Sequence, residues 1–124
     1  MSPLSHIQLH LAREPGHPEG TSEHAYHLYL PLTDTGHIDA QSWREQQNLC
    51  RVTRVRPNEP DAHGRILHGP GGRWTFDYSD RSAEDDEAGF KLEREQFIPG
   101  EYVSIREDDG KTHVFRVVAV SPHN

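Results

Sequence analysis

The chain has 124 residues, of which 32% are hydrophobic and 27% are charged, and its formal net charge is −7 at pH 7. This length suits one domain with a single core, and the negative charge disfavours a general role on nucleic acid or membranes. No apolar run approaches the roughly 20 residues that span a bilayer, and the first residues lack the basic and apolar segments of a signal peptide. We therefore expect one cytoplasmic domain over residues 1–124, with no nucleic-acid or membrane partner.

Two strands are predicted first, over residues 6–11 and 24–30, joined by a loop that contains two prolines and two glycines. In both strands polar and apolar residues alternate, which is the pattern of a strand with one buried face. Because consecutive strands commonly pair, we expect these two to be partners. The apolar residues that would face the core are Ile7, Leu9, Leu11, Tyr26, Leu28 and Leu30.

A short helix is predicted over residues 40–47. Asp39 suits the N-cap position, because its side chain can accept a hydrogen bond from the first turn. Ile38 precedes the cap and can pack on Trp43 four residues inside the helix. The helix is otherwise polar, so we expect it to cover one end of a sheet with that single indole ring.

The next predicted strand covers residues 49–56. Val52 and Val55 are three residues apart, so they share a face only if a β-bulge intervenes. The same strand carries three arginines, Arg51, Arg54 and Arg56. These arginines form either a cationic stripe for an anionic ligand or ion pairs with the chain's own carboxylates.

Cysteine and histidine show no spacing typical of a metal or catalytic site. Cys50 is the single cysteine and is expected to be a small buried residue. Of the ten histidines, His6 and His10 would share a strand face but lie about 13 Å apart. His24 and His27 would point to opposite faces. We therefore predict no metal site and no bound cofactor, although pairing of distant strands leaves open a meeting of other histidines.

The second half of the chain predicts two hairpins. The first surrounds a Gly-Pro-Gly-Gly turn at residues 69–72, and the last surrounds an Asp-Gly turn at residues 109–110. Asp-Gly between alternating apolar runs is among the strongest short-range hairpin signals. The predicted strands are residues 64–68, 73–78, 90–93, 97–105 and 113–120, with an acidic loop at 80–89.

Together these elements predict an all-β domain. We expect a small antiparallel barrel or sandwich of about seven or eight strands with one short helix. The alternative is an α+β fold in which the Trp43 helix packs across a sheet.

One strand of the first hairpin carries a row of aromatic residues. Trp74, Phe76 and Tyr78 share a face, and they form either the core of the domain or a pocket at the mouth of a barrel. A pocket there would place the row beside His68 of the partner strand.

The last hairpin carries two further candidates for a ligand site. Tyr102 and Arg116 have the opposite parity to the apolar residues of their strands, so they reach solvent or a polar cavity. An arginine beside aromatic rings suits a small anionic ligand; alternatively, Arg116 pairs with Glu101 or Glu107 across the hairpin. The candidate binding residues are His68, Trp74, Tyr78, Tyr102 and Arg116.

Two classes of function fit these residues. We favour a binding module for a small anionic ligand or a protein, without catalytic activity, because no catalytic motif is present. The competing class is an enzyme in which His68 acts as acid or base and Asp77 orients it.

The segment at residues 97–105, followed by Arg116, resembles a strand pair in the flavin-binding barrel of ferredoxin-reductase-type enzymes. In that family an Arg-x-Tyr-Ser/Thr motif holds the flavin. Here Val117, Val118 and Ala119 follow the arginine, so the tyrosine and the hydroxyl of the motif are missing. The resemblance therefore implies a barrel and no flavin. The whole chain also resembles a family of small bacterial proteins, which implies no activity.

Overall fold

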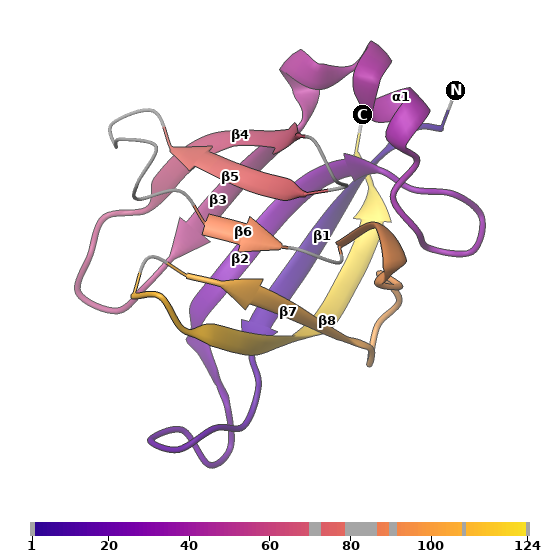
Figure 1. Ribbon diagram of the computed structural model, residues 1–124. Helices are drawn as coiled ribbons and strands as arrows, with labels where there is room; N and C mark the ends of the chain where they lie inside the picture. Colours follow the sequence, from indigo (N-terminus) through magenta and orange to yellow (C-terminus); the bar gives the residue numbers. More distant parts are fainter. Residues whose placement is uncertain (1, 70–72, 79–86, 90–91, 108, 124) are drawn as a thin grey trace.

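The eight strands of the described chain form a closed antiparallel barrel, in which each strand pairs with the next and the last pairs with the first (Figure 1). The computed structural model describes residues 2–69, 73–78, 87–89, 92–107 and 109–123. This confirms the all-β prediction, with the barrel as its form. The strands are β1 (Leu4–Leu11), β2 (Thr21–Pro31), β3 (Arg51–Val55), β4 (Ala62–His68), β5 (Trp74–Tyr78), β6 (Glu87–Gly89), β7 (Tyr102–Arg106) and β8 (Thr112–Pro122).

The interior of the barrel is filled by the apolar residues that alternate along the strands. On β1 these residues are buried, whereas His6, Gln8 and His10 lie on the outer face and are half-buried. The aromatic row of β5 faces inward as well, so it forms core. Residues with no exposed surface include Ile7, Leu9, Tyr26, Leu28, Leu30, Trp74, Phe76 and Tyr78.

One end of the barrel is covered by the helix α1 (Ala40–Glu45), which is followed by the 3-10 segment η1 (Gln47–Leu49) (Figure 1). Asp39 caps the helix by accepting a hydrogen bond from the Ser42 backbone N–H at 3.1 Å. Trp43 is 6% exposed, and its indole N–H donates to the Ile66 carbonyl at 2.9 Å. Ile38 is buried too. The predicted cap and the predicted covering role of Trp43 are confirmed.

β3 differs from its prediction because an arginine faces the core. The strand has no bulge in its pairing; Val52 and Arg54 are buried, and Val55 lies on the outer face. The guanidinium of Arg54 lies over the Tyr78 ring, 4.8 Å from its centroid. An aromatic ring face attracts a cation, so the interior accepts this charge. Of the two alternatives for the arginines, the cationic stripe does not form, since Arg51 is exposed on the opposite face from Arg54. Arg54 lies 4.0 Å from Glu59 and Arg56 lies 3.4 Å from Glu107, so these two have the carboxylate partners of the other alternative.

The strand expected at residues 90–93 is also corrected. The pairing strand is β6, three residues earlier, and it lies between β5 and β7. Residues 90 and 91 lie outside the described residues, and Leu92 begins the 3-10 segment η4 (Leu92–Arg94). The sequence of β6, Glu-Ala-Gly, has no alternation and low strand propensity, so tertiary pairing decides its structure.

The closure of the barrel brings the two ends of the described chain together. β1 pairs with β2 along one edge and with β8 along the other. In these ladders Arg116 of β8 lies opposite His10 of β1 on one side and opposite Tyr102 of β7 on the other. The three side chains therefore form one row across the outer face. None of the helices in the described residues has the length and apolar character needed to cross a membrane.

Candidate functional site

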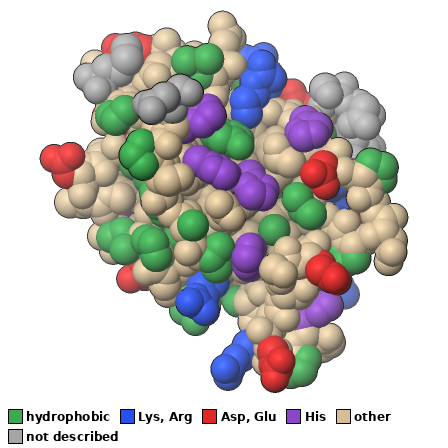
Figure 2. All heavy atoms as spheres, turned by 180° about the vertical axis from the view of Figure 1, so that it is seen from behind, with side chains coloured by type: hydrophobic (Ala, Val, Ile, Leu, Met, Phe, Trp, Pro, Cys, Tyr) green, Lys and Arg blue, Asp and Glu red, His purple; other side chains and the backbone are tan. Residues whose placement is uncertain are grey.

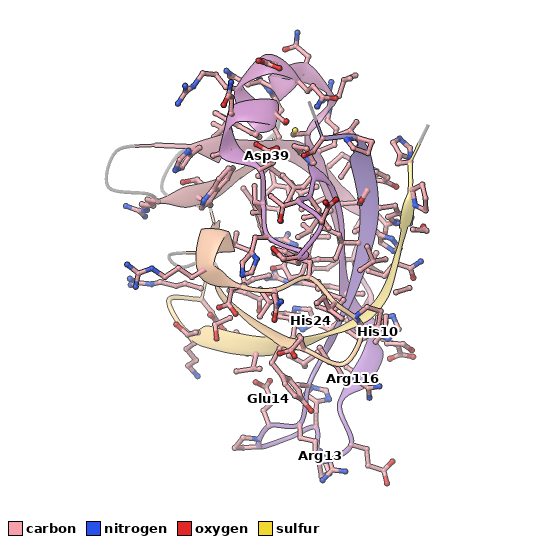
Figure 3. All side chains as sticks on the ribbon, turned by 90° about the vertical axis from the view of Figure 1, so that its right-hand side faces the viewer. His10, Arg13, Glu14, His24, Asp39 and Arg116 are labelled. Atoms are coloured by element: carbon pink, nitrogen blue, oxygen red, sulfur yellow. The ribbon has the colours of Figure 1, made fainter. Side chains whose placement is uncertain are left out.

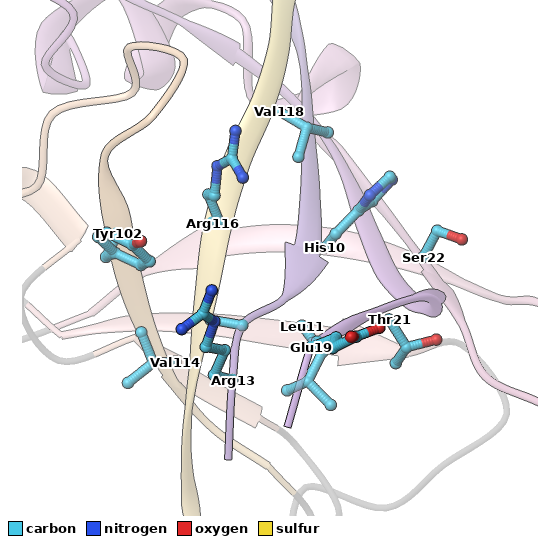
Figure 4. A pocket seen from close by; sticks show the side chains of 12 residues that line it. His10, Leu11, Arg13, Glu19, Thr21, Ser22, Tyr102, Val114, Arg116 and Val118 are labelled. Atoms are coloured by element: carbon cyan, nitrogen blue, oxygen red, sulfur yellow. The ribbon is translucent and has the colours of Figure 1, made fainter. Parts of the chain in front are cut away.

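A groove of about 840 Å³ lies on the outer face of the barrel, beneath the loop that joins β1 to β2 (Figure 4). Residues of β1, β2, β7 and β8 line it, together with residues of the loop at 12–20. The residues that line it include His10, Leu11, Arg13, Glu19, Thr21, Ser22, Tyr102, Val114, Arg116 and Val118.

Backbone hydrogen bonds hold the β1–β2 loop in place. The Ala12 N–H donates to the Val114 carbonyl at 2.9 Å, which ties the start of the loop to β8. Gly20 ends the loop with a φ of +73°, and a Cβ there would lie 2.5 Å from the Leu11 carbonyl oxygen. Only glycine fits this return of the chain. The loop thereby carries Arg13 and Glu19 to the rim of the groove.

The groove concentrates positive charge on an acidic protein. Arg13 and Arg116 are both exposed, and both line the groove (Figure 4). Within the described residues, neither guanidinium has a carboxylate partner. Burial lowers the pKa of His10, and the positive charges of His27 and Arg116 lower it further. Glu19 is the one carboxylate among the described residues that line the groove. With His10 neutral, its charged lining is two arginines and one glutamate.

A second polar cluster surrounds Glu107, which follows β7 and is 4% exposed. Its carboxylate accepts hydrogen bonds from the Tyr26 hydroxyl and from Nε2 of His24, the latter at 2.8 Å. Nη2 of Arg56 lies 3.4 Å away. Burial acts to raise the pKa of Glu107, but the hydrogen bonds from His24 and Tyr26 and the charges of His24 and Arg56 outweigh it and lower the pKa. The carboxylate is therefore ionised at neutral pH.

His113 connects this cluster to the β1–β2 loop. Its Nδ1 lies 2.9 Å from Glu14 in the β1–β2 loop, and its Nε2 lies 3.0 Å from Asp109 and 3.5 Å from Glu107. Ionised carboxylates only accept hydrogen bonds, so both ring nitrogens carry protons. Burial acts to lower the pKa of His113, but the hydrogen bonds to Asp109 and Glu14 and the Glu107 charge raise it overall. A protonated His113 thus anchors the loop that carries Arg13 through its contact with Glu14; Figure 3 shows Glu14 next to Arg13 in this loop.

Histidines also gather on the outer face of β1 and β2 (Figure 2). Nε2 of His6 lies 2.8 Å from Nδ1 of His27, and the His6 ring stacks on Tyr29 at 4.8 Å between centroids. Burial lowers the pKa of His6, as do the charges of His27 and His123. Among the described residues no group of three His, Cys, Asp or Glu side chains is arranged to hold a metal ion.

The five residues predicted for a ligand site do not form one site. Tyr102 and Arg116 lie side by side in the groove. His68, Trp74 and Tyr78 face the barrel interior, where the last two have no exposed surface. His68 stacks on Trp74 with 4.1 Å between ring centroids and 5° between planes, near Trp43 at the α1 end.

The histidine acid or base of the competing hypothesis lacks its expected orienting group. Asp77 pairs with Arg65 in the β4–β5 ladder, and both lie on the outer face, whereas His68 faces inward. Cys50 is fully buried, as predicted, and burial raises the pKa of its thiol to about 11. A thiol with such a pKa stays protonated near neutral pH and is a poor nucleophile.

The expected alternative for Arg116 does not occur in the described part of the chain. Glu107, just after β7, is buried, whereas Arg116 is exposed, and Arg116 forms no ion pair with any described residue. Sequence reasoning missed His10, Arg13 and Glu19, because their proximity to Arg116 depends on the pairing of β1 with β8. The sequence indicated only that His10 faces outward on its strand, from the alternation of polar and apolar residues.

No protein-family model, no curated protein and no solved structure matches this chain. The comparisons therefore add no family to the two resemblances drawn from the sequence. The function has to be argued from the geometry of the site.

Proposed function

We propose that this protein is a cytoplasmic binding module that takes up a small anionic ligand in the groove and has no catalytic activity of its own. The observation that carries the proposal is that Arg13 and Arg116 face one groove without a carboxylate partner in the described residues. On a chain with a net charge of −7, exposed arginines have many carboxylates with which to pair.

The chemistry of the lining supports an anion. A guanidinium presents several N–H donors in a plane and binds carboxylate or phosphate oxygens with two parallel hydrogen bonds. Arg13 comes from a loop and Arg116 from a strand, so they approach a bound anion from different directions. The Thr21 and Ser22 hydroxyls, which also line the groove, supply further donors.

The proposal is tested by NMR titration of the protein with acetate and with inorganic phosphate at low ionic strength. At least one anion should shift the backbone signals of Tyr102, His10 and Arg116. Arg13→Ala and Arg116→Ala should each weaken binding about tenfold, since a hydrogen bond to a charged group contributes about 1.5 kcal/mol or more, and the double variant should lose binding.

Arg51→Ala is the matched control, because Arg51 is an exposed arginine on the outer face of β3, and its affinity should equal that of the wild type. The proposal is wrong if no anion shifts the groove signals, or if the double variant binds as the wild type does.

A further inference from the structure

The groove exposes apolar surface as well as charge. Tyr102 is 57% exposed and Val114 is 40% exposed. They are two of the four large hydrophobic side chains that the described residues expose, the others being Leu49 and Ile98. Both line the groove. Single exposed apolar side chains need no explanation, but two that line one groove beside two arginines mark a binding surface.

The β7–β8 ladder sets these side chains next to Arg116. Tyr102 lies directly opposite Arg116, and Val114 precedes Arg116 by two residues on the same face. Cβ atoms of directly opposed residues lie about 4.5–5.5 Å apart. Tyr102, Val114 and Arg116 therefore lie on the same outer face, with the Tyr102 ring and the Val114 side chain on one side of the groove (Figure 4). A flat apolar ring fits such a surface, because it stacks on tyrosine and on guanidinium.

The charge of the lining distinguishes between anions. Arg13, Arg116 and Glu19 leave one net positive charge when His10 is neutral. A carboxylate carries a single negative charge and balances this sum, whereas a phosphate monoester carries about −1.5 to −2 at pH 7. Glu19 would also repel the second charge of a phosphate. The volume of about 840 Å³ exceeds what one carboxylate group needs and leaves room for an attached ring system.

We propose that the ligand of this groove is an aromatic carboxylate, bound with its carboxylate between Arg13 and Arg116 and its ring against Tyr102 and Val114. This inference rests on the proposed function and adds the chemical class of the ligand. The ring and the carboxylate are recognised by different side chains, so their contributions can be separated by substitution.

The test compares the affinities of acetate, benzoate, 2-naphthoate and phenyl phosphate, measured by NMR titration of the full chain. Benzoate and 2-naphthoate should bind at least about tenfold more tightly than acetate, because a buried ring adds apolar contact. Tyr102→Ala should remove this preference while the acetate affinity stays unchanged. Tyr102→Phe, which keeps the ring, should retain the preference. Leu49→Ala, at an exposed apolar position outside the groove, should behave as the wild type.

The outcomes separate the two proposals. If the aromatic carboxylates bind no better than acetate, or if Tyr102→Ala keeps the preference, the aromatic assignment is wrong and the anion site stands. If phenyl phosphate binds more tightly than benzoate, the carboxylate assignment is wrong. If no carboxylate or phosphate binds, or if Arg13→Ala/Arg116→Ala leaves every affinity unchanged, both proposals fail. Tyr102 is exposed, so its variants should fold, which circular dichroism checks.

Discussion

Glu107 carries a negative charge inside the barrel, and the residues around it decide how that charge is tolerated. An isolated buried carboxylate would take up a proton. Here Tyr26 and His24 donate to it, and Arg56 lies 3.4 Å away. His113 faces Glu107, Asp109 and Glu14 at once. A change in the protonation of one group in this network leaves the charges of its neighbours buried and uncompensated. The free energy of unfolding should therefore depend on pH.

The free energy of unfolding should be highest near pH 6.5, the ordinary pKa of histidine. The raised pKa of His113 contributes stability that is fully present below 6.5 and is lost as the pH rises through its folded pKa. The lowered pKa values of His6 and His10 contribute stability above 6.5 that is lost as the pH falls. The lowered pKa of Glu107 contributes stability above 4.5 that is lost in stronger acid. Urea denaturation across pH 4–9 measures this profile.

Two measurements assign the profile to its residues. His113→Gln should flatten the decline above pH 6.5, whereas His63→Gln, at an exposed position of β4, should leave the decline in place. NMR titration of the histidines should show His113 titrating above 6.5 and His6 and His10 below it. A His113 that titrates below 6.5 would contradict the network described around it.

At the scale of elements, β4 and β5 approach each other so closely that one position permits no side chain. A Cβ on Gly64 would lie 2.4 Å from the Asp77 carbonyl oxygen. Because this oxygen belongs to the backbone of β5, the clash can be relieved only if β5 shifts away from β4. The neighbouring Gly69 has space, since the nearest atom to its Cβ would be 3.9 Å away. Both glycines belong to the same hairpin.

Gly64→Ala should therefore lower the free energy of unfolding by roughly 1–3 kcal/mol, the usual cost of overpacking. Gly69→Ala should stay within about 1 kcal/mol of the wild type, because alanine fits there and restricts the unfolded chain. Urea denaturation of both variants measures the difference. Equal stabilities would show that β4 and β5 can separate at Gly64 without cost.

The elements also show what the sequence could predict. The alternation in β1 and the Asp39 cap are local patterns, and both were predicted. Arg54 was not predicted to face inward, because its partner Tyr78 lies two strands away in the ladder and no local pattern pairs them. β6 was missed because its three residues become a strand through their neighbours and not through their own propensity.

The candidate site was predicted only in part for the same reason. The alternation along their own strands was enough to predict that Tyr102 and Arg116 face away from the apolar core, toward solvent or a polar cavity. The positions of His10 and Arg13 relative to Tyr102 and Arg116 depend on the pairing of β1 with β8. No local sequence pattern predicts which strands pair to close a barrel.

At the scale of the whole molecule, one hydrophobic core connects an end of the barrel that carries the tryptophans with an end that carries the polar cluster around Glu107. The two tryptophans of the chain, Trp43 and Trp74, lie at the α1 end with 5.5 Å between ring centroids. His113 and Glu107 lie toward the opposite end, in the region of Glu14 and His24 (Figure 3). Buried residues of all these regions belong to one continuous hydrophobic cluster.

Unfolding should therefore be a single cooperative transition, as is usual for domains of this size. Tryptophan fluorescence reports the α1 end, the NMR signal of His113 reports the other end, and far-ultraviolet circular dichroism reports the whole barrel. The three should give the same urea midpoint. A lower midpoint by fluorescence would mean that the α1 end unfolds on its own.

The ladder between β1 and β8 has a consequence for how the chain reaches this structure. Until β8 is in place, a seven-stranded meander has two unpaired edges, at β1 and at β7, and β8 satisfies both at once. Unpaired edges are templates for pairing with other molecules, and contacts between distant segments form slowly. A growing chain is therefore most prone to aggregation just before its eighth strand leaves the ribosome, and closure of the ring ends that exposure in one step.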